Sequence, residues 1–156
     1  MIRQATPDDI PQIEDLLYQV QKIHSDGRPD LFKSGEKKYT AEELRALFDD
    51  KDRPIYVAVD GSKILGYAFC IFQHNTGHSM QNITTLYIDD LCVSKDCRGQ
   101  SVGSRLYEYV LKLARETGCY NVTLNVWACN DPAKKFYEKC GLKVQKYGME
   151  TILKEN

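Results

Sequence analysis

A nearly continuous run of apolar and β-branched residues, ITTLYIDDLCV, constrains the fold more than any other feature of this chain. Such a run, over about residues 82–93, predicts a strand buried on both faces at the centre of a sheet. A short junction then leads to Val102, Leu106 and Val110, whose spacing predicts an amphipathic helix that stops at Gly118. A central strand that leads into a helix indicates a βαβ crossover, so we expect part of the sheet to be parallel.

Hairpin signals occur as well. Two β-rich runs, IYVAV and ILGYAFCIF, flank Asp60-Gly61, a dipeptide typical of a tight turn. The other predicted elements are a strand at 2–5, helices after Thr6 and Thr40, a strand at 121–127, a helix from 131 to about 140, and a last strand or hairpin over 143–153. The order β-α-α-β-β-β-α-β-α-β combines hairpins with crossovers, which predicts an α/β fold with a mixed sheet.

Size and composition predict one globular domain over residues 1–156. Of the 156 residues 42% are hydrophobic and 28% charged, and the formal net charge of −1 offers no excess of positive charge to nucleic acid or an anionic membrane. No apolar run approaches the ~20 residues of a membrane span, and no signal-peptide pattern is present. The six cysteines are scattered without a C-x-x-C pair, so we expect a reducing, cytoplasmic setting, with Cys97 and Cys129 in accessible loops.

The junction after the central strand, CRGQSVGS at residues 97–104, carries the sharpest chemical signal. Small residues let backbone N–H groups approach a ligand closely, and a helix N-terminus adds positive partial charge, so the loop suits a pyrophosphate. Arg98 would add charge-assisted hydrogen bonds to the same phosphates. The alternative is a plain strand-to-helix turn with a solvated arginine. The spacing matches neither the Walker loop nor the dinucleotide-binding fingerprint.

Two adjacent carboxylates, Asp89 and Asp90, interrupt the apolar strand. Burying an unpaired carboxylate is costly, so we expect at least one of them to face a cavity, a cation or a hydrogen-bond donor. Because consecutive strand residues point to opposite faces, we also expect the two acids to have different roles.

Together these blocks resemble the GNAT superfamily of acetyl-CoA-dependent N-acetyltransferases. The family's central motif, an apolar strand, then Q/R-x-x-G-x-G/A, then a helix, reads here LYIDDLCV, SKDC, RGQSVG and SRLYEYVLKLA. The next family element, a strand followed by an Asn-initiated helix with Phe-Tyr and a closing Gly, reads NVTLNVWACNDPAKKFYEKCGL. The two blocks span residues 85–142 in the family's order. Ser101 departs from the pattern, since the family usually has its first motif glycine there.

The resemblance implies a GNAT fold, a mixed and mostly antiparallel twisted sheet with helices on both faces. It also implies a bulge in the central strand, which splays apart from the next strand. It also implies acetyl-CoA as the cosubstrate. The pantetheine arm would pair with the backbone of Leu91, Cys92 and Val93, like an added strand. The other residues implied to bind the coenzyme are the pyrophosphate loop, Arg98, Gly99, Gln100, Ser101, Val102, Gly103 and Ser104, together with Asn130.

The resemblance further implies direct attack of a neutral amine on the thioester, without a covalent enzyme intermediate. Tyr137 matches the family's tyrosine that faces the coenzyme sulfur, and a phenol suits the delivery of a proton to the departing thiolate; its alternative role is core packing. The run YIDDLCV also resembles the spermidine/spermine acetyltransferase branch, whose first acid is the base. We therefore expect Asp89 as the base and Asp90 second, the alternative being that both acids orient backbone or bind the charge of the substrate. The N–H of Cys92 or Val93 is the expected donor to the thioester oxygen.

The acceptor amine is less constrained than the coenzyme. The acid pair favours a polyamine or diamine, while aminoglycosides, amino acids and protein N-termini stay open. The loop at 25–39 is either a wall of the acceptor pocket or an ordinary surface loop. Trp127 is expected in the core by default, the alternative being that it lines the pocket. His74 and His78 lie in a hairpin loop without a third ligand, so we expect no metal.

Two rival functions remain at this level, a non-catalytic acyl-CoA-binding regulatory domain and, more distantly, a nucleotide-binding interaction module. The joint presence of Asp89, Asn130 and Tyr137 favours catalysis. Members of the family often form dimers, so the resemblance also allows a homodimer.

Overall fold

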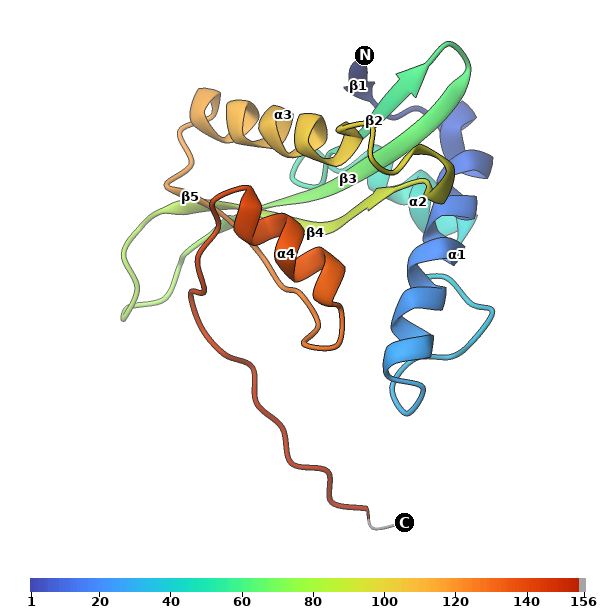
Figure 1. Ribbon diagram of the computed structural model, residues 1–156. Helices are drawn as coiled ribbons and strands as arrows, with labels where there is room; N and C mark the ends of the chain where they lie inside the picture. The colour runs from blue at the N-terminus through green and yellow to red at the C-terminus, as the bar shows by residue number, and fades with distance from the viewer. Residues whose placement is uncertain (155–156) are drawn as a thin grey trace.

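A computed structural model describes residues 1–154 and contains one five-stranded sheet (Figure 1). Neighbouring strands are antiparallel from the first to the fourth, whereas the fourth and fifth are parallel. The prediction of a mixed, mostly antiparallel sheet is therefore confirmed. The strands lie side by side in chain order as β1 (Ile2–Gln4), β2 (Ile55–Asp60), β3 (Lys63–His74), β4 (Thr84–Val93) and β5 (Asn121–Leu124).

Helices cover both faces of the sheet (Figure 1). Among the described residues, α1 (Ile10–Gly27) and α2 (Ala41–Phe48) lie on one face. On the other face lies α3 (Val102–Glu116), with α4 (Asp131–Lys139) beside it. Short 3-10 turns precede α1 and α3, namely η1 (Pro7–Asp9) and η2 (Lys95–Cys97). α2 begins as predicted, because Thr40 Oγ1 accepts from the Glu43 N–H at 3.1 Å while the Glu43 carboxylate accepts from the Thr40 N–H at 3.2 Å. This reciprocal cap satisfies N–H groups that the helix leaves without partners.

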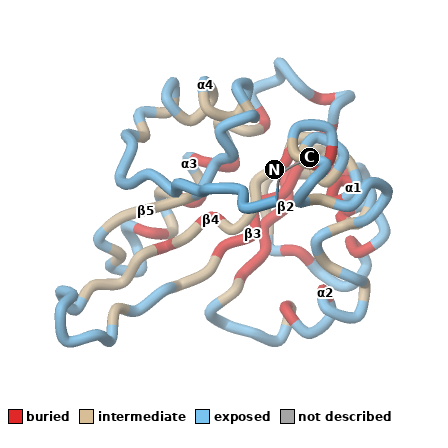
Figure 2. Tube along the Cα trace, turned by 90° about the horizontal axis from the view of Figure 1, so that it is seen from below, coloured by how far each residue is buried: buried red, intermediate tan, exposed pale blue. Residues whose placement is uncertain are grey.

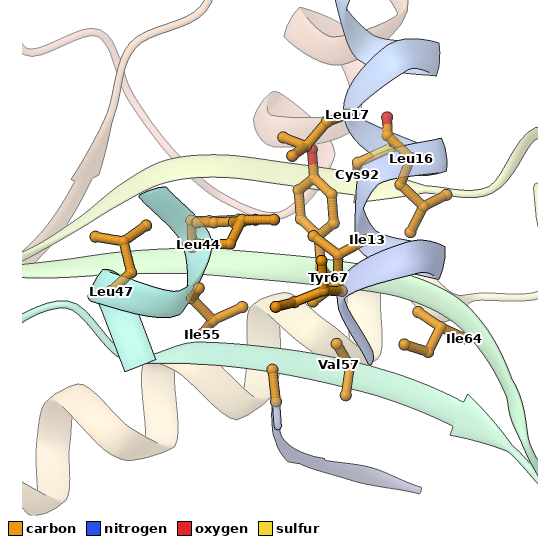
Figure 3. Close-up of a cluster of buried hydrophobic side chains, with 13 residues drawn as sticks. Ile13, Leu16, Leu17, Leu44, Leu47, Ile55, Val57, Ile64, Tyr67 and Cys92 are labelled. Carbon is orange, nitrogen blue, oxygen red and sulfur yellow. The ribbon is translucent and has the colours of Figure 1, made fainter. Parts of the chain in front are cut away.

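The sheet separates two clusters of buried side chains. In the first, α1 and α2 place Ile13, Leu17 and Leu44 over Tyr67 of β3, and all four side chains are fully buried (Figure 3). The second lies under α3, and Figure 2 shows how the buried positions gather along the middle strands. β4 is thus a central strand covered on both faces, as its sequence predicted. Under α3 the buried residues include Leu86, Ile88, Leu106 and Val110.

The chain after α4 departs from the prediction. Residues 142–154 form no strand and run extended away from the body of the molecule (Figure 1). Strand structure needs a neighbouring strand that takes up its N–H and C=O groups, and residues 143–154 make no backbone hydrogen bond with any part of the described chain. The strand or hairpin predicted at 143–153 is therefore wrong. β5 is also shorter than predicted and ends at Leu124 rather than at Trp127.

Cysteine exposure differs from the prediction at one position. Cys97 is only 3% exposed, because η2 turns its side chain into the cluster under α3, so its predicted accessibility is wrong. Cys129 is exposed, as predicted, and all six cysteines are free thiols. In the part of the chain that the structure describes, no helix combines the length and the apolar character that crossing a membrane requires.

Candidate active site

The loop between η2 and α3 presents a row of uncommitted backbone donors. Among the described residues, the N–H groups of 98–104 make no backbone hydrogen bond, and the first bond of the helix runs from the Arg105 N–H to the Ser101 C=O at 3.1 Å. No side chain accepts from these seven N–H groups either. Arg98 lies exposed beside them. A row of free donors at the positive end of α3 is the geometry that binds a phosphate or pyrophosphate.

The conformation of this loop explains why its residues are small. Ser101 has φ 61° and ψ 19°, the left-handed region, and Gly99 has φ 83°. An L-residue other than glycine pays ~1–2 kcal/mol for the left-handed conformation. The Ser101 side chain makes no capping hydrogen bond that would offset this cost. The loop therefore holds a shape that glycine would adopt without strain, at the position where the resembled motif has its first glycine.

The β4 and β5 strands separate beside this loop. Their pairing covers only Thr85–Ile88 against Asn121–Leu124, so in the described chain residues 89–93 of β4 have a strand neighbour on the β3 side alone. The N-terminus of α3 packs directly against this stretch: a Cβ on Gly103 would lie 3.1 Å from Phe136 Cζ and 3.4 Å from Val93 Cγ2. The splayed strand pair implied by the resemblance is present, and its unpaired edge ends at the row of free N–H groups.

A β-bulge in β4 changes the orientation of the acid pair. Phe69 of β3 is opposite Asp90 and Cys70 is opposite Ile88, so Asp89 is the extra residue of the bulge. The extra residue shifts the alternation of side chains by one position. Both acids consequently lie on the face covered by α1 and α2, and the expectation that they point to opposite faces is wrong.

Asp89 is held by hydrogen bonds on both carboxylate oxygens. Lys38 Nζ lies 2.9 Å from Oδ1, and the Tyr39 hydroxyl donates to Oδ2 at 2.5 Å. Tyr39 in turn accepts from Arg53 at 3.1 Å and stacks on Phe69. The side chain of Asp89 is only 13% exposed. Its charge is compensated and its position fixed, which suits an orienting role.

Asp90 has the opposite environment. Its Oδ2 accepts from the Tyr67 hydroxyl at 2.7 Å, and no second side chain within residues 1–154 donates to the carboxylate. Burial raises the pKa of Asp90 to about 6, although hydrogen bonds from Tyr67 and the Leu91 backbone and the charge of Lys38 oppose the rise. A carboxylate with a pKa near neutrality and no ion-pair partner is poised to accept a proton.

Tyr137 of α4 reaches the same place. Burial raises the pKa of the Tyr137 phenol, and the negative charge of Asp90 raises it further, so the two side chains are close enough to interact. Burial also raises the pKa of the Cys92 thiol, again assisted by Asp90. Tyr137 therefore keeps its proton at neutral pH.

The other residues expected at the site are placed as follows. Asn130 Oδ1 accepts from the Ala133 N–H at 3.3 Å, which makes it the N-cap of α4. Cys92 is buried on the α1 face, whereas Leu91 and Val93 are half-buried on the α3 face. All three belong to the stretch of β4 without a partner on the β5 side. The structure thus brings the loop, the strand edge, Asp90 and Tyr137 together.

Three aromatic side chains, His24, Phe32 and Trp127, form an aromatic wall on the far side of the region where β4 and β5 separate. Phe32 packs edge-on against Trp127, with ring centroids 5.1 Å apart, and against His24 at 4.9 Å. Gly27, at the end of α1, touches the β5–α4 loop so closely that a Cβ there would lie 2.7 Å from Cys129 Sγ. Trp127 is 41% exposed, so the core position expected by default is wrong and the alternative of pocket lining stays open. Burial and the charge of Lys38 lower the pKa of His24, which keeps this wall uncharged at neutral pH.

Several site residues escaped the sequence analysis. Tyr67 and Lys38 contact the acids only through long-range packing, from positions 23 and 51 residues away in the chain. Alternation along β3 places Tyr67 on an inward face, yet nothing local marks it as the partner of Asp90. The resemblance implies a bulge in the central strand, but neither glycine nor proline marks its position at Asp89.

The donor set fits acetyl-CoA. The free N–H groups of 98–104, the exposed Arg98 and the unpaired edge of β4 are complementary to a pyrophosphate and an extended amide-bearing arm. Within residues 1–154, no group of three or more His, Cys, Asp or Glu side chains is arranged to hold a metal. His74 instead hydrogen-bonds Thr84 at 2.8 Å.

Comparison with known proteins identifies the family. The model of the acetyltransferase (GNAT) family matches residues 17–142 of the chain. The glucosamine 6-phosphate N-acetyltransferase of Arabidopsis thaliana is 29% identical over 108 residues, which cover 65% of this chain and 64% of that protein. The thialysine N-epsilon-acetyltransferase of Bos taurus is 28% identical over 81 residues, 52% of this chain and 45% of that protein. The chain thus spans less than two thirds of the length of these curated relatives.

Solved structures match over nearly the whole chain. The crystal structure of a mutant of the BH1408 protein from Bacillus halodurans is 31% identical and superposes with a TM-score of 0.93, covering 98% of this chain and 99% of that one. The fold described above is therefore reproduced almost end to end in a crystal structure.

Proposed function

Because this chain belongs to the GNAT acetyltransferase family, we propose that it transfers the acetyl group of acetyl-CoA to a primary amine. The observation that carries the proposal is the meeting of three features at one point: the free N–H groups of 98–104, the unpaired edge of β4, and the Asp90–Tyr137 pair. Each suits a different part of the reaction.

The coenzyme is proposed to bind where β4 and β5 separate, along the unpaired edge of β4. The N–H groups of 98–104 and the Arg98 guanidinium would hold the pyrophosphate, and the backbone of Leu91 to Val93 would pair with the pantetheine amides. Bound acetyl-CoA supplies the activated thioester. The N–H of Cys92 or Val93 is the proposed donor to its carbonyl oxygen, where negative charge develops.

The proton transfers are proposed to use Asp90 and Tyr137. An amine attacks only as the neutral base, so one proton must leave the ammonium first and the nitrogen must lose another after attack. The Asp90 carboxylate accepts the first proton, because its pKa is about 6 and no second side chain binds it among the described residues. Tyr137 stays protonated at neutral pH and donates its hydroxyl proton to the departing sulfur, and the proton that the nitrogen loses after attack restores the phenol.

Asp89 remains the alternative base. Its carboxylate is committed to Lys38 and Tyr39, so it would act only if the substrate displaced one of them or if a water molecule relayed the proton. The structure supports a positioning role better, because the bulge residue that Asp89 forms sets the direction of Asp90.

The acceptor is proposed to be a small primary amine. Lys38 already compensates Asp89, so Asp90 is the one member of the acid pair that is free to hold an ammonium group, and a diamine or polyamine fits with one end at Asp90. The relatives add two candidates, a phosphorylated amino sugar and the amino acid thialysine. The scattered free thiols fit a reducing compartment, so we propose a cytoplasmic enzyme.

The test is the release of free thiol from acetyl-CoA in the presence of a panel of polyamines, amino sugars and their phosphates, amino acids, aminoglycosides and N-terminal peptides. We expect amine-dependent thiol release with at least one class. Binding of acetyl-CoA without turnover on any amine would instead support a non-catalytic acyl-CoA-binding domain. A chemically competent acetyl-cysteine detected by mass spectrometry would replace direct attack with a two-step transfer.

The role of Tyr137 has its own test. Tyr137→Phe keeps the ring and removes the proton, so we expect kcat to fall by roughly 10²- to 10⁴-fold while acetyl-CoA affinity stays within about twofold. Tyr120→Phe is the matched control, because Tyr120 is 75% exposed and lies outside the site. An unchanged kcat in Tyr137→Phe would remove Tyr137 from the acid role.

A further inference from the structure

Lys38 places a primary amine at the acid pair of the candidate active site. Its Nζ atom lies 2.9 Å from Oδ1 of Asp89 and 3.3 Å from the backbone oxygen of the same residue. The charge of Lys38 also reaches Asp90, where it opposes the rise in pKa that burial causes, and His24, where it adds to burial in lowering the pKa. The amine is thus close to both acids and to the aromatic wall.

The residues on either side of Lys38 hold the loop at this place. Lys37 forms an ion pair with Glu14 of α1 at 3.0 Å, and the Tyr39 hydroxyl donates to the bulge residue of β4. Residues 33–39 make no backbone-to-backbone hydrogen bond within the described chain, so side-chain contacts such as these fix the position of the loop.

The Lys38 amine itself is free to move. Its side chain is 45% exposed, and an ion pair that is partly exposed contributes only ~0–1 kcal/mol, so leaving Asp89 costs little. The flexible four-carbon stem of lysine also lets the amine swing while the loop stays in place.

The geometry of β4 brings this amine close to the proposed place of the thioester. The pantetheine arm is proposed to pair with Leu91 to Val93, and Lys38 is held on Asp89, two residues before that stretch. A strand rises ~3.3 Å per residue, so the two places lie within ~7 Å of each other along the backbone. Rotation of the lysine stem covers a distance of this size.

We propose that Lys38 is a site of self-acetylation, at which its amine attacks acetyl-CoA bound to the same molecule when no acceptor is present. The inference rests on the proposed function. The ammonium first passes a proton to Asp89, its partner in the ion pair. The new N–C bond then forms as the C–S bond breaks, Tyr137 gives its proton to the departing sulfur, and the proton that the nitrogen loses restores the phenol.

The products are an acetylated Lys38 and free coenzyme A. An acetylated lysine carries no charge and forms no ion pair, so Asp89 loses the cation that compensates it. Self-acetylation thus changes the charge of the acid pair.

The test is incubation of the full chain with acetyl-CoA and no added amine, followed by digestion and mass spectrometry of the acetylated lysines. Lys37 is the matched control, because this neighbouring amine is held on α1 by Glu14 and Tyr18. We expect Lys38 to be acetylated at least about tenfold faster than Lys37. Because the transfer occurs within one molecule, its rate constant should not change between about 1 and 100 μM protein.

A variant ties the modification to the active site. Tyr137→Phe should slow acetylation of Lys38 by the same factor as it slows amine turnover, and it should leave the slow chemical acetylation of Lys37 unchanged. Circular dichroism checks that the variant stays folded. A Lys38 rate that does not follow amine turnover in this variant would overturn the inference.

Three results in the wild-type protein would also overturn it. Equal rates at Lys37 and Lys38 would mean ordinary chemical reactivity, and a rate constant that rises with protein concentration would mean transfer between molecules. Amine turnover without acetylation of Lys38 would refute self-acetylation and leave the proposed function standing, whereas the absence of both reactions would refute the two together.

Discussion

Replacing Asp90 by asparagine should stabilise the protein while impairing its chemistry. Burial moves the pKa of Asp90 from its ordinary 3.8 to about 6. Each pKa unit corresponds to ~1.4 kcal/mol, so keeping Asp90 ionised costs the folded state about 3 kcal/mol. Asparagine preserves the shape and an oxygen that accepts from Tyr67, but it carries no charge. Asp90→Asn should therefore raise the free energy of unfolding by up to about 3 kcal/mol at pH 8.

The raised pKa of Asp90 fixes the direction in which the stability of the protein changes with pH. Between pH 3.8 and about 6 the folded state holds the Asp90 proton more tightly than the unfolded state does, so the stability contributed by this group falls as pH rises through that window. The cost is absent below pH ~4 and complete above pH ~6. The advantage of Asp90→Asn over wild type should thus be near zero at pH 4 and largest at pH 8.

The assay is urea unfolding of wild type and Asp90→Asn at pH 4, 5, 6, 7 and 8, with the difference between the two proteins taken at each pH. Asp89→Asn is the control, because Lys38 and Tyr39 bind that carboxylate, and its loss should destabilise by about 1–2 kcal/mol at pH 7. A variant Asp90→Asn that is less stable than wild type at pH 8, or whose advantage does not grow with pH, would refute the reasoning.

Two further predictions concern the fold, and both are measured by chemical denaturation. Gly66→Ala should lower the free energy of unfolding by about 1–3 kcal/mol, because the new Cβ would lie 2.6 Å from the backbone oxygen of Cys92 in the paired strand. Gly77→Ala is the control: the space around it is open, so it should change stability by less than about 0.5 kcal/mol. Equal effects of the two substitutions would contradict this reasoning. Ser101→Gly should stabilise the protein by about 0.5–1 kcal/mol, because it relieves the strain of the left-handed conformation and removes no capping hydrogen bond. A destabilised variant would show that the serine side chain has a function of its own.

Local patterns in the sequence predicted most of the elements and the coenzyme side of the site. The helix from Thr40, the termination at Gly118 and the long central strand all rest on contacts within a few residues, so their signals are local. The loop at 97–104 is local too: its small residues, its place before a helix and Arg98 form one continuous segment. Because these signals lie in one continuous stretch of the chain, residues 85–142 alone carry the resemblance to the family.

The acid pair shows what the sequence left undecided. Alternation along a regular strand puts Asp89 and Asp90 on opposite faces, and only the pairing of β3 with β4 reveals the bulge that turns both to one face. The division of labour between them then depends on Tyr39, Lys38 and Tyr67, which arrive from other elements. Since a pKa depends on burial and on neighbours in space, no reading of the strand itself could rank the two carboxylates.

The sequence by itself therefore determined which segments are helix or strand and where an anionic coenzyme would bind, because those properties depend on neighbouring residues along the chain. The tertiary structure decided which carboxylate is free, which side chains form the acceptor wall, and that residues 143–153 have no partner strand within their own chain. These properties depend on distances between segments that lie far apart in the sequence, and only packing sets such distances.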